Sequence, residues 1–123
     1  MTEIRLLLVD DHDVVRTGIK MLLESQKDLL IVGEASSGAQ AIEMSRSLQP
    51  DVIVMDLTLP DISGIEVTRQ LKAEKPGQAI VALTIHEDEQ YFFKMLQAGA
   101  SGYVPKRAAP DELVAAIRTA YQG

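Results

Sequence analysis

The sequence contains no cysteine and no long hydrophobic run. The absence of cysteine excludes a disulfide framework, thiolate catalysis and a cysteine zinc site, and leaves oxygen and nitrogen atoms as ligands. No stretch approaches the roughly 18 apolar residues needed to cross a bilayer, and the first apolar run, residues 4–9, is too short for a secretory signal. We therefore expect a cytoplasmic protein without a membrane partner.

Basic residues are outnumbered by acidic ones. The chain has 12 lysines and arginines against 18 aspartates and glutamates, which gives a net charge of -6. Such a surface repels the phosphate backbone of nucleic acid on average, so these residues are not expected to bind DNA directly. A length of 123 residues, 46% of them hydrophobic, predicts one domain with one core, spanning residues 1–123.

Five short apolar runs alternate with segments of helical periodicity. The runs predict buried strands, because strands covered on both faces lose the alternation of apolar and polar residues. They lie at residues 4–9, 29–32, 52–55, 79–83 and 103–104. The helical apolar sets are Val15, Ile19, Leu22 and Leu23; Ala41, Ile42 and Leu48; Val67 and Leu71; Phe92, Met95 and Leu96; and Leu113, Ala116, Ile117 and Ala120. This order predicts a doubly wound α/β fold with a five-stranded parallel sheet and helices on both faces.

Several polar and special residues are placed as helix boundaries. Ser37 and Ser63 each precede a glutamine or glutamate by three residues, which is capping-box spacing. Pro110 suits the first turn of a helix, and Gly99 suits a left-handed helix end. These boundaries support the predicted alternation.

Polar residues follow the predicted strands at the edge where open parallel sheets bind ligands. Asp10 and Asp11 follow the first strand, Asp56 the third, Thr84 the fourth and Lys106 the fifth. Three carboxylates at one edge require a cation, and an all-oxygen set suits Mg²⁺ or Mn²⁺. The Lys106 ammonium and the Thr84 hydroxyl can interact with the negatively charged oxygens of a phosphoryl group. Together these groups predict aspartyl-phosphate chemistry.

Over essentially the whole chain, these motifs resemble the receiver domains of bacterial two-component response regulators, which have the CheY-like (βα)5 fold. The matching segments are Leu8-Val9-Asp10-Asp11-His12, Val54-Met55-Asp56-Leu57-Thr58-Leu59-Pro60, Ala82-Leu83-Thr84 and Gly99-Ala100-Ser101-Gly102-Tyr103-Val104-Pro105-Lys106. The Asp-Asp-His start and the Ala-Gly-Ala-Ser-Gly-Tyr segment are similar to the NarL/FixJ (LuxR-type) subfamily.

The resemblance implies a signalling protein in which Asp56 accepts a phosphoryl group from a sensor histidine kinase with the help of Mg²⁺. Such a domain is not an enzyme that turns over a separate substrate; it promotes only its own phosphorylation and dephosphorylation. The implied metal ligands are Asp10, Asp11, Asp56 and the Thr58 backbone carbonyl, and the implied phosphoryl contacts are Thr84 and Lys106.

The resemblance also implies a conformational switch. Thr84 would turn inward to the phosphoryl group, and Tyr103 would fill the space that it leaves. From its position alone, Tyr103 is equally explained as a packed edge-strand aromatic. Thr58 and His86 would flank the path of the hydrolytic water and tune dephosphorylation. His12 is expected at the start of the first helix, with no chemical role.

The subfamily likeness implies a C-terminal helix-turn-helix output domain in the parent protein, absent from these residues. DNA would then be bound only through that domain. A second copy of the chain is a candidate partner on phosphorylation, and the sequence leaves the oligomeric state open. A stand-alone receiver is equally compatible with the sequence. One departure concerns the lysine: many receivers place proline after it, whereas here Pro105 precedes Lys106 and Arg107 follows it.

Two other classes of function share parts of this pattern. A phosphatase of the haloacid-dehalogenase type also forms an aspartyl phosphate, but it needs a second aspartate two residues after the nucleophile, where this chain has Thr58. An interaction module with a vestigial pocket, or a flavodoxin-like cofactor binder, is disfavoured by the complete polar set and by the lack of a glycine-rich loop after the first strand.

Overall fold

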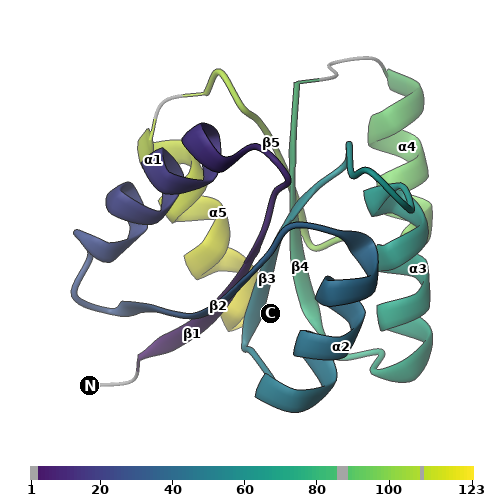
Figure 1. The fold of residues 1–123 in the computed structure, drawn as a ribbon, viewed down its shortest axis with the longest axis horizontal. Helices are drawn as coiled ribbons and strands as arrows, with labels where there is room; N and C mark the ends of the chain where they lie inside the picture. The colour runs from purple at the N-terminus through teal and green to yellow at the C-terminus, as the bar shows by residue number, and fades with distance from the viewer. Residues whose placement is uncertain (1–2, 86–88, 109) are drawn as a thin grey trace.

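The computed structural model describes residues 3–85, 89–108 and 110–123. Within them, five strands alternate with five helices (Figure 1). In chain order the elements are β1 (Ile4–Val9), α1 (Asp13–Glu24), β2 (Leu29–Ala35), α2 (Gly38–Leu48), β3 (Val52–Asp56), α3 (Gly64–Glu74), β4 (Ala79–Thr84), α4 (Glu89–Ala98), β5 (Gly102–Pro105) and α5 (Pro110–Gln122). None of the described helices is long and apolar enough to cross a membrane.

The strands form one parallel sheet in the order β2-β1-β3-β4-β5. Helices α1 and α5 cover one face, and α2, α3 and α4 cover the other (Figure 1). The predicted doubly wound α/β fold is confirmed. The carboxyl ends of β1, β3, β4 and β5 meet along one edge of the sheet, because all the strands run in the same direction.

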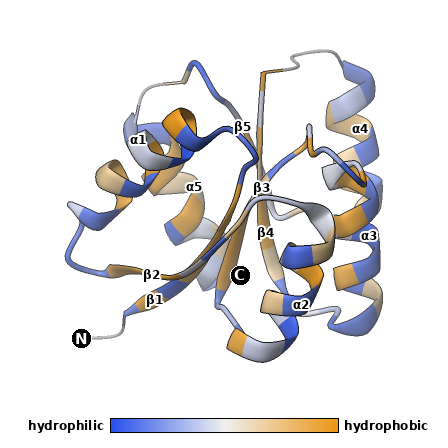
Figure 2. Ribbon diagram, in the orientation of Figure 1, coloured by the Kyte–Doolittle hydropathy of each residue, from blue (hydrophilic) through white to orange (hydrophobic). Residues whose placement is uncertain are grey.

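The core lies in layers on the two faces of the sheet. Successive strand residues point to opposite faces, so Leu6 and Leu8 pack in the cluster with α1 and α5, whereas Leu7 and Val9 pack in the cluster with α2 and α3. Figure 2 shows the result: the central strands are hydrophobic along their length, while the helices alternate between hydrophobic and hydrophilic residues. Double-sided burial explains why the strand sequences are apolar runs.

The second strand is longer than the predicted 29–32 and continues to Ala35. Its pairing with β1 shifts by one residue between Leu6 and Leu7, which is a β-bulge. Beyond the bulge, Glu34 lies at the sheet edge and pairs with Arg16 and Lys20. The prediction ended early because an edge strand tolerates charged residues that interrupt an apolar run.

The predicted helix boundaries are confirmed. The Ser37 hydroxyl accepts a hydrogen bond from the Gln40 amide at the start of α2, and Ser63 caps α3 in the same way. Gly99 follows α4 with a φ of 102°, and Pro110 is the first residue of α5.

Candidate functional site

The sheet register brings the predicted polar residues to one edge. Val9 pairs with Met55, so Asp10 and Asp56 continue two neighbouring strands at the same level. On the other side of β3, Asp56 pairs with Leu83, which places Thr84 one residue further along β4. The Lys106 amide donates to the Thr84 carbonyl oxygen over 2.7 Å, extending the pairing of β4 with β5.

Two of the three carboxylates are enclosed. Asp10 is fully buried and Asp56 is 1% exposed, whereas Asp11 is partly exposed. Asp56 Oδ1 accepts a hydrogen bond from the Thr58 amide over 3.1 Å, and Asp10 Oδ1 accepts one from the His12 amide over 2.8 Å. The backbone turns after β1 and β3 therefore hold both carboxylates in defined orientations.

The ammonium group of Lys106 bridges the two buried carboxylates. Its Nζ lies 3.0 Å from Asp10 Oδ2 and 3.2 Å from Asp56 Oδ2. One ammonium cannot balance three carboxylates, and Asp11 Oδ1 is buried without a hydrogen bond. Acceptors left in this state are costly unless a cation is near. The side chains thus fit a bound metal ion.

Burial raises the pKa of the Asp56 carboxyl above its ordinary value. The Thr58 amide and the Lys106 ammonium act in the opposite direction, and the negative charge of Asp10 adds to the increase. The ionised form of Asp56 is therefore stabilised less than it would be in water. A carboxylate in this condition is a better nucleophile and gains more from a nearby cation.

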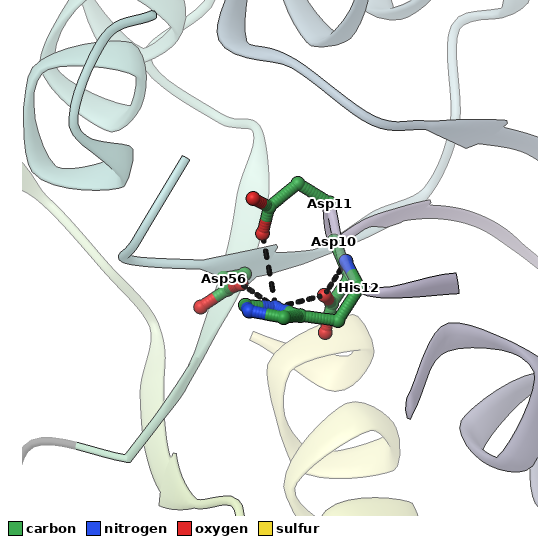
Figure 3. Close-up of side chains that lie close together, drawn as sticks. All are labelled: Asp10, Asp11, His12 and Asp56. Carbon is green, nitrogen blue, oxygen red and sulfur yellow. Dashed lines mark hydrogen bonds and ion pairs between the residues drawn. The ribbon is translucent and has the colours of Figure 1, made fainter. Parts of the chain in front are cut away.

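His12 belongs to this cluster, although sequence reasoning gave it no chemical role. Its Nδ1 lies 3.1 Å from Asp10 Oδ1, 3.0 Å from Asp11 Oδ1 and 3.8 Å from Asp56 Oδ2. Figure 3 shows the imidazole lying among the three carboxylates. His12 is the N-cap residue of α1, as expected, but its extended backbone turns the ring toward the acidic residues. Its place in the Asp-Asp-His sequence is the only local signal for this contact.

The structure describes three of the remaining predicted site residues. Thr84 is fully buried, and the Tyr103 ring on β5 packs edge-on against Phe92 of α4, with 5.4 Å between ring centroids. Thr58 is exposed at the mouth of the site. His86 lies outside the described residues, so its predicted position is not tested. Among the described peptide bonds none is cis, those beside Lys106 included.

Comparisons with known proteins agree with this geometry. The response regulator receiver domain model matches residues 6–118. The response regulator UvrY of Escherichia coli (strain K12) is 45% identical over 120 residues, which cover 98% of this chain and 55% of UvrY. The response regulator GacA of Pseudomonas viridiflava is also 45% identical, with 98% and 56% covered. A solved two-component response regulator of the LuxR family, from Aurantimonas sp. SI85-9A1, is 40% identical with a TM-score of 0.96, covering 99% of this chain and 87% of that one.

The chain belongs to the response regulator receiver domain family, and its likeness to LuxR-type regulators confirms the predicted subfamily. It is a two-component signalling domain and not a catalytic enzyme. This assignment removes the phosphatase alternative, in agreement with the absence of a carboxylate at Thr58. The chain spans about half the length of the curated relatives that it matches.

Proposed function

We propose that Asp56 accepts a phosphoryl group from a phosphohistidine of a sensor histidine kinase, and that this event controls transcription. The observation that carries the proposal is the environment of Asp56. Its carboxylate is enclosed at the end of the central strand, one oxygen is held by the Thr58 amide, and the other faces the Lys106 ammonium. The carboxylate therefore has a fixed orientation and a cation beside the position of the incoming group.

We assign the metal site to Asp10, Asp11, Asp56 and the backbone carbonyl of Thr58, with Mg²⁺ as the resident ion and Mn²⁺ as a substitute. The buried Asp11 Oδ1 supports the assignment, since it lacks a hydrogen bond, and so does the single ammonium that faces Asp10 and Asp56 in a cluster of three carboxylates. When bound, Mg²⁺ supplies positive charge that offsets the charge on the oxygens of the transferring group.

In the proposed reaction, an oxygen of Asp56 forms a bond to phosphorus as the bond between phosphorus and the histidine nitrogen breaks. The electron pair of the broken bond stays on the histidine of the kinase. The Lys106 ammonium offsets charge on the phosphoryl oxygens, and the Thr84 hydroxyl donates to one of them. The same groups support later hydrolysis of the acyl phosphate, so the domain resets itself.

Phosphorylation puts about 1.5 to 2 negative charges and three acceptor oxygens where the single charge of the Asp56 carboxylate stood. Thr84 then turns toward the phosphoryl group, and Tyr103 moves into the space behind it, which remodels the surface formed by α4, β5 and α5. Thr58 and His86 tune the lifetime of the phosphorylated state. Replacing His86 by alanine and following acyl-phosphate decay tests whether His86 affects dephosphorylation. An unchanged lifetime would show that it does not.

We place the domain in the cytoplasm, upstream of a helix-turn-helix output domain and with homodimer formation on phosphorylation. The LuxR family named for the solved Aurantimonas regulator supports such an output domain, as does the length of UvrY and GacA. The net charge of -6 supports an indirect role in DNA binding, because the receiver itself repels phosphate.

The test is the intact mass of the protein after incubation with Mg²⁺ and acetyl phosphate. We expect one added phosphoryl group in the wild type and none in Asp56→Asn. Asp28→Asn is the matched control, since Asp28 precedes β2 at the opposite end of the sheet and pairs with Arg118. Equal modification of wild type and Asp56→Asn would show that Asp56 is not the acceptor.

A further inference from the structure

The imidazole of His12 lies where a cation would lie. Its Nδ1 faces carboxylates from the ends of β1 and β3, and each of the four side chains offers one ligand atom within 4.8 Å of the others (Figure 3). The His12 side chain is 54% exposed, so burial among apolar neighbours does not dictate this position. The ring is held there by a hydrogen bond between Nδ1 and Asp10 Oδ1 and by its approach to Asp11 Oδ1.

Two separations within the cluster match those of ligands around one ion, and all four ligand atoms lie within 4.8 Å of one another. Two atoms bound at about 2.1 Å from a common ion lie about 3.0 to 3.4 Å apart at octahedral or tetrahedral angles. His12 Nδ1 is 3.1 Å from Asp10 Oδ1 and 3.0 Å from Asp11 Oδ1, which agrees with that range. The 3.8 Å to Asp56 Oδ2 is slightly longer and requires only a small side-chain movement.

The position of Lys106 leaves this side of the pocket open to an ion. Its Nζ contacts Asp10 through Oδ2, whereas His12 faces Asp10 through Oδ1. An ion beside His12 therefore need not displace the lysine from Asp10. In addition, Asp11 Oδ1 is buried without a hydrogen bond, so a ligand atom is available next to the imidazole.

We propose that His12 Nδ1 is a direct ligand of Zn²⁺ in the pocket of Asp10, Asp11 and Asp56, and that His12 makes this pocket selective for Zn²⁺ over Mg²⁺. The inference rests on the metal site of the proposed function. Imidazole nitrogen is a preferred ligand of Zn²⁺, whereas Mg²⁺ prefers oxygen ligands and retains water. The half-exposed ring can move away when Mg²⁺ binds, because Mg²⁺ does not prefer a nitrogen ligand.

Zinc binding would also prevent phosphorylation. A zinc ion held by four protein groups has a closed tetrahedral site, whereas a reactive site keeps an open position. With His12 and three aspartates as ligands, no position is left for an oxygen of the phosphodonor. The Zn²⁺-bound domain is therefore a state that does not accept a phosphoryl group, and His12 is the residue that makes it.

The experiment measures Zn²⁺ and Mg²⁺ affinities by calorimetry on the wild type, His12→Ala and His12→Gln. Side-chain ¹⁵N spectra of the histidines report whether Nδ1 is bound. The chain has two histidines, so His86→Ala assigns the second signal and is the matched control. Both His12 variants are expected to weaken Zn²⁺ binding at least about tenfold, since even outer partners of metal ligands have effects of about 10 to 100-fold. Mg²⁺ affinity stays within about twofold, and the His12 Nδ1 signal shifts with Zn²⁺ only.

Three results overturn the inference: unchanged Zn²⁺ affinity in both His12 variants, loss of Zn²⁺ binding in His86→Ala alone, or tighter binding of both ions without His12. The last result would mean that the imidazole competes with the metal. The proposed function fails separately. If the wild type binds Zn²⁺ through His12 but, in Mg²⁺ and acetyl phosphate without Zn²⁺, gains no phosphoryl group on Asp56, only the proposed function is contradicted. If Asp56 is phosphorylated in Mg²⁺ but the His12 signal never shifts with Zn²⁺, only the inference is contradicted.

Discussion

Gly64, the first residue of α3, packs directly against the main chain of Asp56. A β-carbon at position 64 would overlap the Asp56 carbonyl oxygen and would lie 2.8 Å from the Leu57 α-carbon. The Gly64 amide also donates to the Leu57 carbonyl oxygen over 2.9 Å. The start of α3 thus contacts the backbone that positions the Asp56 carboxylate, and only glycine permits this approach.

Replacing Gly64 by alanine is expected to move this backbone. We predict a loss of about 1 to 3 kcal/mol in the free energy of unfolding, because the new methyl group overlaps main-chain atoms that cannot rotate away. Phosphorylation of Asp56 should slow in the same variant. Urea denaturation and the rate of phosphoryl mass gain measure the two effects.

Gly18→Ala is the matched control for this substitution. Gly18 lies within α1, and a β-carbon there would have no neighbour within 4 Å. The change should stabilise the protein by roughly 0.5 to 1 kcal/mol, because alanine is the better helix former. If both variants are equally stable, the close approach at Gly64 has no energetic consequence and the prediction is wrong.

Lys106→Gln removes the ammonium that bridges Asp10 and Asp56. Two buried carboxylates would then face each other without their cation, so we expect the metal-free protein to lose on the order of 1 to 3 kcal/mol of stability. Phosphoryl transfer should also slow strongly. Lys27→Gln, which alters an exposed lysine near the opposite end of the sheet, should change neither quantity. A Lys106 variant phosphorylated at the wild-type rate would exclude a role in charge stabilisation.

Asp56→Asn should make the metal-free protein more stable at neutral pH. Burial raises the folded-state pKa of Asp56 above the ordinary 3.8, so the protonated form is favoured in the folded protein. The stabilising contribution of this group is complete below about pH 4 and is lost as pH rises through the folded-state pKa. The advantage of the variant therefore grows with pH above about 4. Urea titrations in a chelator between pH 3.5 and 7.5 measure the difference in the free energy of unfolding between the variant and the wild type. A difference that shrinks as the pH rises would contradict a raised pKa of Asp56.

Asp61 has the opposite pH dependence. Its carboxylate oxygens accept hydrogen bonds from the Gly38 and Ala39 amides at the start of α2, and these bonds lower its pKa below 3.8. Its contribution is present above about pH 4 and is lost as pH falls through the lowered pKa. Asp61→Ala should therefore destabilise the protein at neutral pH and have less effect at lower pH. Glu43→Ala, on the exposed side of α2, is the control. Equal effects of the Asp61 and Glu43 substitutions would show that the Asp61 cap of α2 does not stabilise the protein.

The strands and the acidic edge were predictable because both depend on local sequence. Residues 52–55 are apolar throughout since β3 is covered on both faces, and the polar residues that follow the strands meet wherever parallel strands end. Contacts that depend on backbone direction were not predictable. The ring of His12 reaches the carboxylates through the extended N-cap conformation, and Asp61 caps a helix that begins 23 residues before it. The tight approach of Gly64 to Asp56 likewise exists only in three dimensions.

The position of the Tyr103 ring after phosphorylation distinguishes a conformational switch from simple packing. Its ring is partly buried and packs edge-on against Phe92, with an interplanar angle of 90°. If Tyr103 moves inward on phosphorylation, this contact is expected to break, because Phe92 lies on α4 and is 40% exposed at the surface. We expect ring-to-ring nuclear Overhauser contacts between Phe92 and Tyr103 without a phosphodonor and their loss with Mg²⁺ and acetyl phosphate. The Tyr121 ring on α5 is the internal control and should be unaffected. Contacts that persist in fully phosphorylated protein would make Tyr103 a packing residue, and the signal would then have to leave the site by another path.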